Sequence, residues 1–433
     1  MKKSLLLLCL ALSYTTLCQN YQVSTVAGNG FQGNVNGPAA NSELYQPYGV
    51  TTDNDSAIYI ADVQNHSIRK LNYLTNKVSL VAGSGSSGYQ DGIGTSAKFN
   101  APVGVFYSMG FVYVVEASAR IRKIDLNNSN TVSTVAGTGV AGFQNGAVTS
   151  AKFSNPTGIW VDPNGDIYVA DYQNHCIRLI SGGQVTTYAG IPNSSGLVNG
   201  ALLSSKFNLP RHIVRNAKGD LYVGELGNNV LRKISGGNVS TFSGNGTQAS
   251  VDGSATTASF AHPGGICVAP FGYFYVTDGT GHKVRKVDSL GNVVTVAGTG
   301  VSGFTDGAGT SAQFNRPEAI CYDHHGNIYI GDSDNERVRR VSIPEVFGIS
   351  SYNDLLSDIV ISPNPTSGQV SIRWPKKEEF TYILRNELGA IQRKGISTGT
   401  NQDLDFSGLA AGHYFITFTN NQATFTKKLV IQK

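Results

Sequence analysis

A repeat of 53 to 55 residues runs through most of the sequence and limits the folds that it can adopt. Its clearest marker is a run such as IYIADVQNHSIRK (58–70), in which an acidic residue stands six or seven positions before an arginine. A fixed period of this length indicates a repeat architecture, in which each repeat forms one structural unit. The acid–arginine pair occurs six times, at Asp62 and Arg69, Glu116 and Arg122, Asp171 and Arg178, Glu225 and Arg232, Asp278 and Arg285, and Asp332 and Arg339.

Each repeat divides into four short strand patterns, a to d, which in the third repeat read GIWVD, IYVAD, IRLI and VTTYAG. Valine, isoleucine and tyrosine dominate these patterns, and the 51 glycines of the chain suit the turns between them. Four strands per repeat and six repeats predict an all-β fold, a six-bladed β-propeller over residues 19–343. The chain starts with a d pattern at Val23, and its last repeat ends after c near Ser342. We therefore expect the N-terminal strand to complete the sixth blade and to close the ring.

The first 18 residues, MKKSLLLLCLALSYTTLC, read as a secretory signal peptide. Their apolar run is too short to span a bilayer, so no transmembrane segment is expected. Cleavage after Cys18 is the favoured interpretation, and a lipoprotein anchored through Cys18 is the alternative. The mature chain then keeps Cys176, Cys267 and Cys321, an odd number without close spacing. This pattern predicts buried thiols rather than a disulfide framework.

The runs DYQNHCIRLI and DVQNHSIRKL resemble NHL repeats, and the resemblance extends from about residue 23 to residue 343. Repeats two, four and six depart from the Asn-His pair of these runs. The resemblance implies a six-bladed propeller. It implies no single function, because NHL-like propellers include protein and RNA binders, extracellular sensor domains and a zinc lyase.

The composition changes after Ile343, where residues 344–357 read as a linker. Residues 358–433 show alternating strand patterns, which predict a small β-sandwich. Their pattern PNPTSG, ELGA, LAAGHYFITF and KKLVIQK resembles the C-terminal sorting domain of the type IX secretion system. By that resemblance the secretion machinery is a partner, and the chain passes through the periplasm to be secreted or attached to the cell surface. An ordinary adhesive sandwich is the alternative.

Three sets of repeated polar residues are candidate sites. Because acid and arginine recur in every repeat, we interpret them as structural ion pairs at the b–c corner, with a repeated surface contact as the alternative. His66, His175 and His282 share one repeat position, but strand c lies about 10 Å further from the axis than strand a, so we expect hydrogen-bonded histidines and no metal. The carboxylates of Asp91, Asp252 and Asp306 fall short of the oxygens that calcium requires.

Departures from the repeat gather at the mouth of the predicted channel. The prolines that open strand a are flanked in blades four to six by polar residues, and Tyr48 holds a matching position in blade one. Convergent polar groups in a concavity are typical of a ligand site. The alternative is a plug, in which Arg211 or Arg316 pairs with Glu318. The candidate ligand-binding residues are Arg211, His212, His262, Arg316, Glu318 and Tyr48.

The composition bounds the function. Charged residues make up 14% of the chain and the net charge is +4, which argues against a nucleic-acid-binding surface. The sequence contains no phosphate loop, nucleophile elbow or paired zinc spacing, so no cofactor is expected. The favoured function is a non-enzymatic, monomeric binding module for an extracellular protein or glycan. The alternative is a secreted hydrolase or lyase with its active site at the channel mouth.

Overall fold

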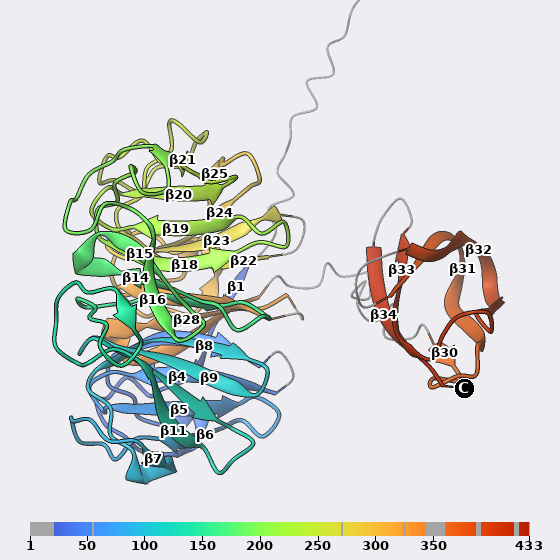
Figure 1. Ribbon diagram of the computed structural model, residues 1–433, viewed down its shortest axis with the longest axis horizontal. Helices are drawn as coiled ribbons and strands as arrows, with labels where there is room; N and C mark the ends of the chain where they lie inside the picture. The colour runs from blue at the N-terminus through green and yellow to red at the C-terminus, as the bar shows by residue number, and fades with distance from the viewer. Residues whose placement is uncertain are drawn as a thin grey trace, which may run out of the picture. The chain divides into compact units, whose positions relative to one another are not determined.

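The computed structural model describes residues 21–53, 56–269, 272–323, 326–342, 360–386, 391–419 and 424–432 (Figure 1). The chain divides into two compact units, Met1–Pro344 and Glu345–Lys433. The predicted signal peptide (1–18), with the possible lipid attachment at Cys18, and the predicted linker (344–357) lie outside the described residues. Within the described ranges, no helix has the length and apolar character needed to cross a membrane.

The first unit is built from six antiparallel sheets, as the repeat predicts (Figure 1). Blades one and two contain β3 (Pro47–Thr52), β4 (Ala57–Asp62), β5 (Ser67–Asn72) and β6 (Lys77–Ala82), then β8 (Pro102–Ser108), β9 (Phe111–Glu116), β10 (Arg120–Asp125) and β11 (Thr131–Ala136). Blades three and four contain β13 (Ile159–Val161), β14 (Ile167–Asp171), β15 (Cys176–Ser181) and β16 (Gln184–Ala189), then β18 (Pro210–Arg215), β19 (Leu221–Glu225), β20 (Val230–Ser235) and β21 (Asn238–Ser243). Blade five contains β22 (Pro263–Val268), β23 (Phe274–Asp278), β24 (Lys283–Val287) and β25 (Val293–Ala297).

Blade six joins the two ends of the propeller sequence. It consists of β27 (Pro317–Tyr322), β28 (Ile328–Asp332), β29 (Arg337–Ser342) and the N-terminal strand β1 (Gln22–Ala27). Strand β1 pairs with β29, from Gln22 opposite Ser342 to Thr25 opposite Arg339, which confirms the predicted pairing. The innermost strands contact one another in turn, and β27 contacts β3. The chain thus enters and leaves the propeller at its c–d end, opposite the end where the acid–arginine corners lie.

A short fifth strand, which the sequence did not predict, lies at the outer edge of five blades. It belongs to the long connection between strand d of one blade and strand a of the next, and it pairs with the outermost strand. A d strand would otherwise leave its outer edge unpaired, so two residues of the connection cover it. The fifth strands are β2 (Gly37–Pro38), β7 (Gly92–Ile93), β12 (Gly146–Ala147), β17 (Gly200–Ala201) and β26 (Gly307–Ala308), and the described 3-10 helices are η1 (Ala39–Asn41), η2 (Gly94–Ser96), η3 (Tyr172–Asn174), η5 (Gly309–Ser311) and η6 (Ser333–Asn335).

The cores of the propeller lie between neighbouring sheets. One apolar residue of each d–a connection is fully buried and anchors that connection. The thiols Cys176, Cys267 and Cys321 are free and buried, as predicted. The anchors are Leu44, Phe99, Phe153, Phe207, Phe260 and Phe314.

The second unit is a β domain, as predicted, and its strands are joined by hydrogen bonds through β31. Val370 and Ile372, from the start of β31, share one core with Leu384, from its end. Because β31 is long and pairs with three other strands, it links the two halves of the domain around this core. The strands are β30 (Val360–Ser362), β31 (Gln369–Asn386), β32 (Ile391–Asp405), β33 (Gly412–Thr419) and β34 (Thr424–Ile431).

Candidate functional site

The acid–arginine residues form buried ion pairs. In blade three, Arg178 Nη1 lies 2.6 Å from Asp171 Oδ2, and neither side chain is exposed. The same guanidinium donates to the main-chain oxygens of Lys152 and Gln144, each at 2.9 Å, in the connection that enters the blade. The other carboxylate oxygen of Asp171 accepts the Ser154 N–H at 2.8 Å. The pair therefore holds the long connection against the blade, in addition to joining the b–c corner.

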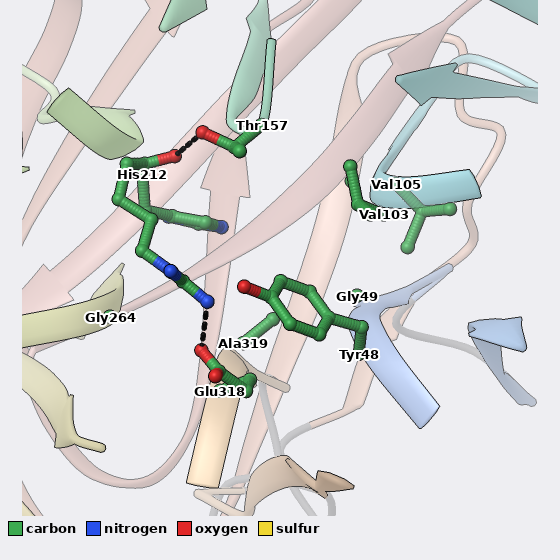
Figure 2. Close-up of a pocket in the computed structure, with 11 residues that line it drawn as sticks. Tyr48, Gly49, Val103, Val105, Thr157, His212, Gly264, Glu318 and Ala319 are labelled. Carbon is green, nitrogen blue, oxygen red and sulfur yellow. Dashed lines mark hydrogen bonds and ion pairs between the residues drawn. The ribbon is translucent and has the colours of Figure 1, made fainter. Parts of the chain in front are cut away.

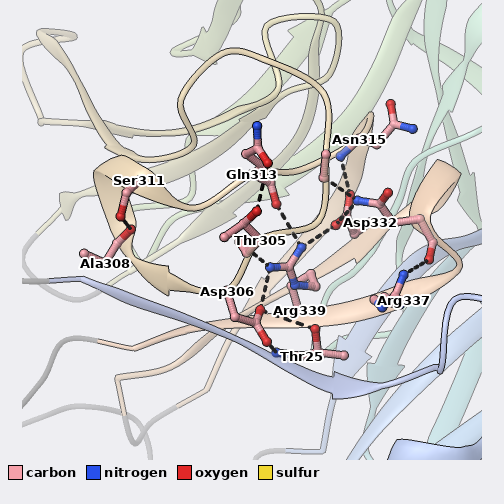
Figure 3. Close-up of polar contacts among 12 residues, drawn as sticks. Thr25, Thr305, Asp306, Ala308, Ser311, Gln313, Asn315, Asp332, Arg337 and Arg339 are labelled. Atoms are coloured by element: carbon pink, nitrogen blue, oxygen red, sulfur yellow. Dashed lines mark hydrogen bonds and ion pairs between the residues drawn. The ribbon is translucent and has the colours of Figure 1, made fainter.

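The arrangement recurs around the ring. Figure 3 shows it in blade six, where Arg339 binds Asp332 at 2.7 Å and the oxygens of Gln313 and Thr305. Because these charges are buried, they lack the exposure that a repeated surface contact would need. The remaining pairs are Arg69 with Asp62 at 2.8 Å, Arg122 with Glu116 at 3.1 Å, Arg232 with Glu225 at 3.0 Å and Arg285 with Asp278 at 3.0 Å.

The connection carboxylates also bind the motif arginines. Asp91, Asp252 and Asp306 lie 2.6 to 2.7 Å from Arg122, Arg285 and Arg339, respectively. In blades one, three and four an asparagine takes the same place, and its side-chain oxygen accepts the bond from the arginine. These asparagines are Asn36, Asn145 and Asn199. Each aspartate is thus half-exposed and paired with a guanidinium.

The histidines of the repeat form hydrogen bonds between blades. Each Nδ1 atom accepts the backbone N–H of the residue before the proline in the next blade. The bonds join His66 to Ala101 (3.2 Å), His175 to Leu209 (3.1 Å) and His282 to Arg316 (3.2 Å). In blade six Glu336 Oε2 accepts the Gln46 N–H in the same way, at 2.5 Å. We call these four contacts the blade latches. Within the described part of the chain, no group of three or more histidine, cysteine or acidic side chains is placed to hold a metal.

The channel mouth contains a shared ion pair. Glu318, which is almost fully buried, accepts Arg211 Nη2 at 2.5 Å and Arg316 Nε at 2.9 Å. The Arg211 guanidinium also lies over the ring of Tyr48, 4.9 Å from its centroid. Figure 2 shows the side chains of Tyr48 and Glu318 beside each other in the pocket at the channel mouth. One carboxylate serves two arginines, so the cluster carries an excess positive charge on the half-exposed Arg316.

The two histidines of the mouth are uncharged at neutral pH. Burial, together with the nearby Arg211, lowers the pKa of His212 to about 4. Its Nδ1 atom is buried and has no hydrogen-bond partner. Burial also lowers the pKa of His262, whose Nε2 lies 3.3 Å from Gln248 Nε2. Among the described residues, no carboxylate forms a salt bridge with either imidazole, although Glu318 and Asp278 act to raise the pKa of His262.

Tyr172 belongs to the same neighbourhood and was missed in the sequence. Burial and the nearby Glu318 raise the pKa of its hydroxyl, while Arg316 lowers it. A signal was present, because other repeats carry Val63, Ala117, Leu226, Gly279 or Ser333 at this position. A tyrosine among small or aliphatic residues is a departure of the kind that identified the mouth.

The cavity enclosed at the mouth is small. Its volume is about 20 Å³, which is roughly the space that one bound water requires. Four predicted site residues line it, namely Tyr48, Arg211, His212 and Glu318. Arg316 and His262 do not line it, although Arg316 binds Glu318. In this conformation the paired side chains fill most of the channel entrance.

Exposed apolar side chains gather on the d–a connections. The described propeller residues include 15 large apolar side chains with high exposure, and 11 of them lie in these connections. In the sequence these apolar residues are interleaved with glycine and small polar residues. They are Phe31, Val35, Tyr89, Ile93, Val140, Leu197, Val198, Leu203, Val251, Val301 and Phe304.

Comparison with protein families gives two matches. A model described as NHL repeat matches residues 153–178. A model described as secretion system C-terminal sorting domain matches residues 360–432, which is nearly the whole second unit.

Relatives and a solved structure are similar to most of the chain. The protein Suppressor of quenching 1 from Arabidopsis thaliana is 27% identical over 334 residues, covering 74% of this chain and 27% of its own length. NHL repeat-containing protein 2 from Bos taurus is 27% identical over 339 residues, covering 69% of this chain and 46% of its own length. This chain therefore spans less than half of either relative. An auxiliary nutrient binding protein from Bacteroides thetaiotaomicron shares the fold with a TM-score of 0.58 and 18% identity, over 75% of this chain and 77% of that one.

Proposed function

This chain is an NHL-repeat β-propeller followed by a type IX secretion sorting domain, and we propose that it is a non-enzymatic binding module for an extracellular protein or glycan. The sorting domain supports secretion to the cell surface or the extracellular space and implies contact with the secretion machinery. The propeller is the part that remains for recognition. A binding role also agrees with the description of one protein of this fold as a nutrient binding protein.

The exposed apolar side chains of the d–a connections carry this proposal. Exposed apolar surface is used for interaction sites in soluble proteins, and these side chains recur on one kind of connection. The buried ion pairs hold the connections against the blades, so a partner would meet a preformed surface and lose little affinity to ordering. Phe31, Val140 and Val301 stand three residues after the last glycine of strand d in their repeats, with exposures of 71%, 57% and 62%. They define a set that can be changed without touching the core.

We assign the channel-mouth cluster a structural role in this proposal. Glu318 is already bound by Arg211 and Arg316, and the enclosed space is about 20 Å³. A ligand entering the channel would have to break these charge-assisted hydrogen bonds, which are stronger than neutral ones. This cost favours a plug that closes the axis, and the proposal therefore assigns recognition to the connections.

The first prediction tests the binding surface. The purified parent protein is screened against arrays of extracellular proteins and glycans, and affinities for captured binders are measured by calorimetry. We expect the triple variant Phe31→Ser, Val140→Ser and Val301→Ser to bind about tenfold or more weakly, which corresponds to a loss of about 1.4 kcal/mol. The matched control changes Leu74, Met109 and Leu290 to serine. These residues are equally exposed but lie in a–b and c–d turns, at the other end of the strands.

Equal affinities of the two triple variants would place the interaction elsewhere. The variant Arg211→Ala then decides between the two sites. Weaker binding of the captured partner at unchanged stability would indicate that the partner binds at the channel mouth. Capture of no protein or glycan by the parent would remove the binding proposal itself.

A further inference from the structure

A groove of about 840 Å³ runs along the outer rim where blade six meets blade one. Its walls come from β1, from the connection that enters blade six, and from β29, while Ala40 and Asn76 of blade one close the other side. The volume falls within the usual range of about 300–1,000 Å³ for sites of small ligands. The groove is thus large enough for one or two sugar units, unlike the cavity at the channel mouth.

A cation without a carboxylate partner lies in this groove. Arg340 of β29 lines it and forms no hydrogen bond, ion pair or ring contact with any residue that the structure describes, although its charge acts on the hydroxyl of the buried Tyr329 opposite it in the sheet. The residue that could have paired with it across the blade is Asn327, whose side-chain amide donates instead to Asp323 at 3.0 Å. An arginine is weakly hydrated and presents a planar fork that fits carboxylates and similar oxyanions. Arg340 is therefore available to an anionic ligand.

The matching cations of the other repeats have partners. Four repeats have a lysine at the position of Arg340, and each lysine has a partner in its own blade. Lys233 pairs with Asp220 at 2.8 Å. The other lysines lie over aromatic rings, at centroid distances of 5.6 Å for Lys70 over Tyr59, 4.6 Å for Lys123 over Phe111 and 4.0 Å for Lys286 over Tyr273.

Ser24 adds a second unpaired polar group next to Arg340. The two residues face each other across the β1–β29 pair, so their Cβ atoms lie about 5 Å apart. The Ser24 Oγ and the Arg340 Nε are both buried without a hydrogen-bond partner. Buried polar atoms are rarely left unsatisfied, and a ligand or bound water is one explanation for such a pair.

The remaining lining residues give the groove a positive charge and an aromatic wall. Its one carboxylate, Asp306, is occupied by Arg339 and by the Thr25 N–H and hydroxyl (Figure 3). Arg337 donates to main-chain oxygens and covers one face of the Phe304 ring at 4.4 Å, while that ring stays 57% exposed. The neutral polar groups facing the groove belong to Ser24, Thr25, Asn29, Asn76 and Thr305.

We propose that this groove binds an acidic saccharide, with a carboxylate or sulfate group on Arg340 and Ser24. The neutral polar groups suit sugar hydroxyls, and the exposed part of the Phe304 ring suits the C–H face of a sugar ring. The extracellular destination of the chain places it among such polymers. The site does not depend on the exposed apolar residues Phe31, Val140 and Val301, which do not line the groove.

The test is calorimetry on the full chain with three probes: an oligogalacturonate, a heparin-derived hexasaccharide and neutral maltohexaose. We expect at least one acidic probe to bind, with weaker affinity as salt rises, and the neutral probe not to bind. Arg340→Gln should weaken binding about tenfold or more, and so should Ser24→Ala, because each removes a hydrogen bond to a charged group. Neither change breaks a hydrogen bond or ion pair between described side chains, so the melting temperature should stay close to the parent value.

The matched control is Lys286→Gln, which removes the cation at the same repeat position in blade five, and it should bind the saccharide as the parent does. Three results would contradict the proposal. They are no binding of either acidic probe by the parent, parental affinity in both Arg340→Gln and Ser24→Ala, or a loss of affinity in Lys286→Gln as large as that in Arg340→Gln. The triple variant of the connections should keep saccharide binding. A triple variant that loses only the protein partner would therefore not contradict the saccharide site. A parent protein that fails to bind the saccharide would not contradict the connection surface.

Discussion

The six motif arginines use two kinds of partner in the d–a connections. Arg122, Arg285 and Arg339 bind an aspartate, and the other three bind an asparagine at the same repeat position. The aspartate of blade two, Asp91, is 42% exposed, whereas the partner acid Glu116 is not exposed at all. A half-exposed ion pair contributes little to stability, because water screens it. The buried acid is a different case, since its loss leaves a guanidinium charge without compensation.

These two environments give a second prediction. Asp171→Ala should lower the free energy of unfolding by about 3–5 kcal/mol, because it strands the buried Arg178. Asp91→Asn should change it by less than about 1 kcal/mol, because an asparagine serves the same arginine position in three other blades. Urea unfolding of both variants provides the comparison. Similar losses in the two would show that the stability comes from the connection contact and not from burial of the pair.

At the residue scale the sequence identified the acid and the arginine but not the main-chain groups that they bind. Recurrence marks Asp171 and Arg178 because both are side chains with a fixed spacing. Their other partners include the main-chain oxygens of Lys152 and Gln144 and the N–H of Ser154. Main-chain groups are the same at every residue, so no pattern of letters could reveal them.

At the scale of the elements, the blade latches connect one sheet to the next. A latch residue stands immediately before strand c in the left-handed region, with φ near 50° at His66, His175 and His282, and its side chain reaches the following blade. The position carries Ala119 in blade two, which has no acceptor to offer. In blade four the buried Asn229 Oδ1 has no partner. The described latches therefore support four of the six junctions.

The histidine latches predict a pH dependence of stability. Burial lowers the pKa of His66, His175 and His282 in the folded state, although Asp334 and Asp278 oppose this at His282. The unfolded chain, with histidine pKa values of about 6.5, binds protons first, so stability is complete above that pH and falls as the pH drops below it. Protonation of Nδ1 also removes the acceptor of the latch. Melting temperatures should therefore decline between pH 7.5 and pH 5.

His175→Ala separates the latch from other titrating groups. At pH 7.5 it should lower the free energy of unfolding by about 0.5–1.5 kcal/mol through loss of one hydrogen bond. Alanine fits the backbone, because Ala119 adopts the same conformation with a φ of 66°. The variant should also show a shallower decline toward pH 5, and the triple variant of His66, His175 and His282 a shallower one still. An unchanged slope in the triple variant would assign the pH dependence to other groups.

For the whole molecule, the repeat alone determined the number of blades and the strand order. The position of the N-terminal strand also followed from it, because a d pattern without an a pattern before it needs a partner sheet. The groove at the junction of blades six and one could not be found this way. Ser24 and Arg340 are 316 positions apart in the chain, and only the pairing of β1 with β29 brings them together. Arg340 lacks a hydrogen-bond partner because of how the folded junction is built, and the neighbouring sequence does not indicate this.

The N-terminal strand makes the ring depend on its first ten described residues. Strand β1 covers the edge of β29, and β26 in turn covers β1, so removing it exposes one edge and leaves β26 without its partner. Tyr21 and Val23 are buried in the core between blades five and six, and Ala27 in the core between blades six and one. Their loss therefore opens both sides of blade six. We expect deletion of Tyr21–Gly30 to lower the melting temperature by several degrees and to promote aggregation through the open edge.

Calorimetry and light scattering on the deletion variant test this expectation, and the same variant mixed with a synthetic peptide of residues 21–30 is the control. Because the strand is bound through its main chain and the Tyr21, Val23 and Ala27 side chains, the peptide should restore part of the melting temperature in a concentration-dependent way. A peptide with Val23→Asp should restore less, since it places a charge in the core between blades five and six. A deletion variant that melts at the parent temperature as a monomer would mean that β1 is dispensable for joining the ring. If the deletion variant also binds the saccharide as the parent does, the groove formed by β1 is not the saccharide site. The two measurements together therefore decide whether one strand both joins the propeller and builds its anion site.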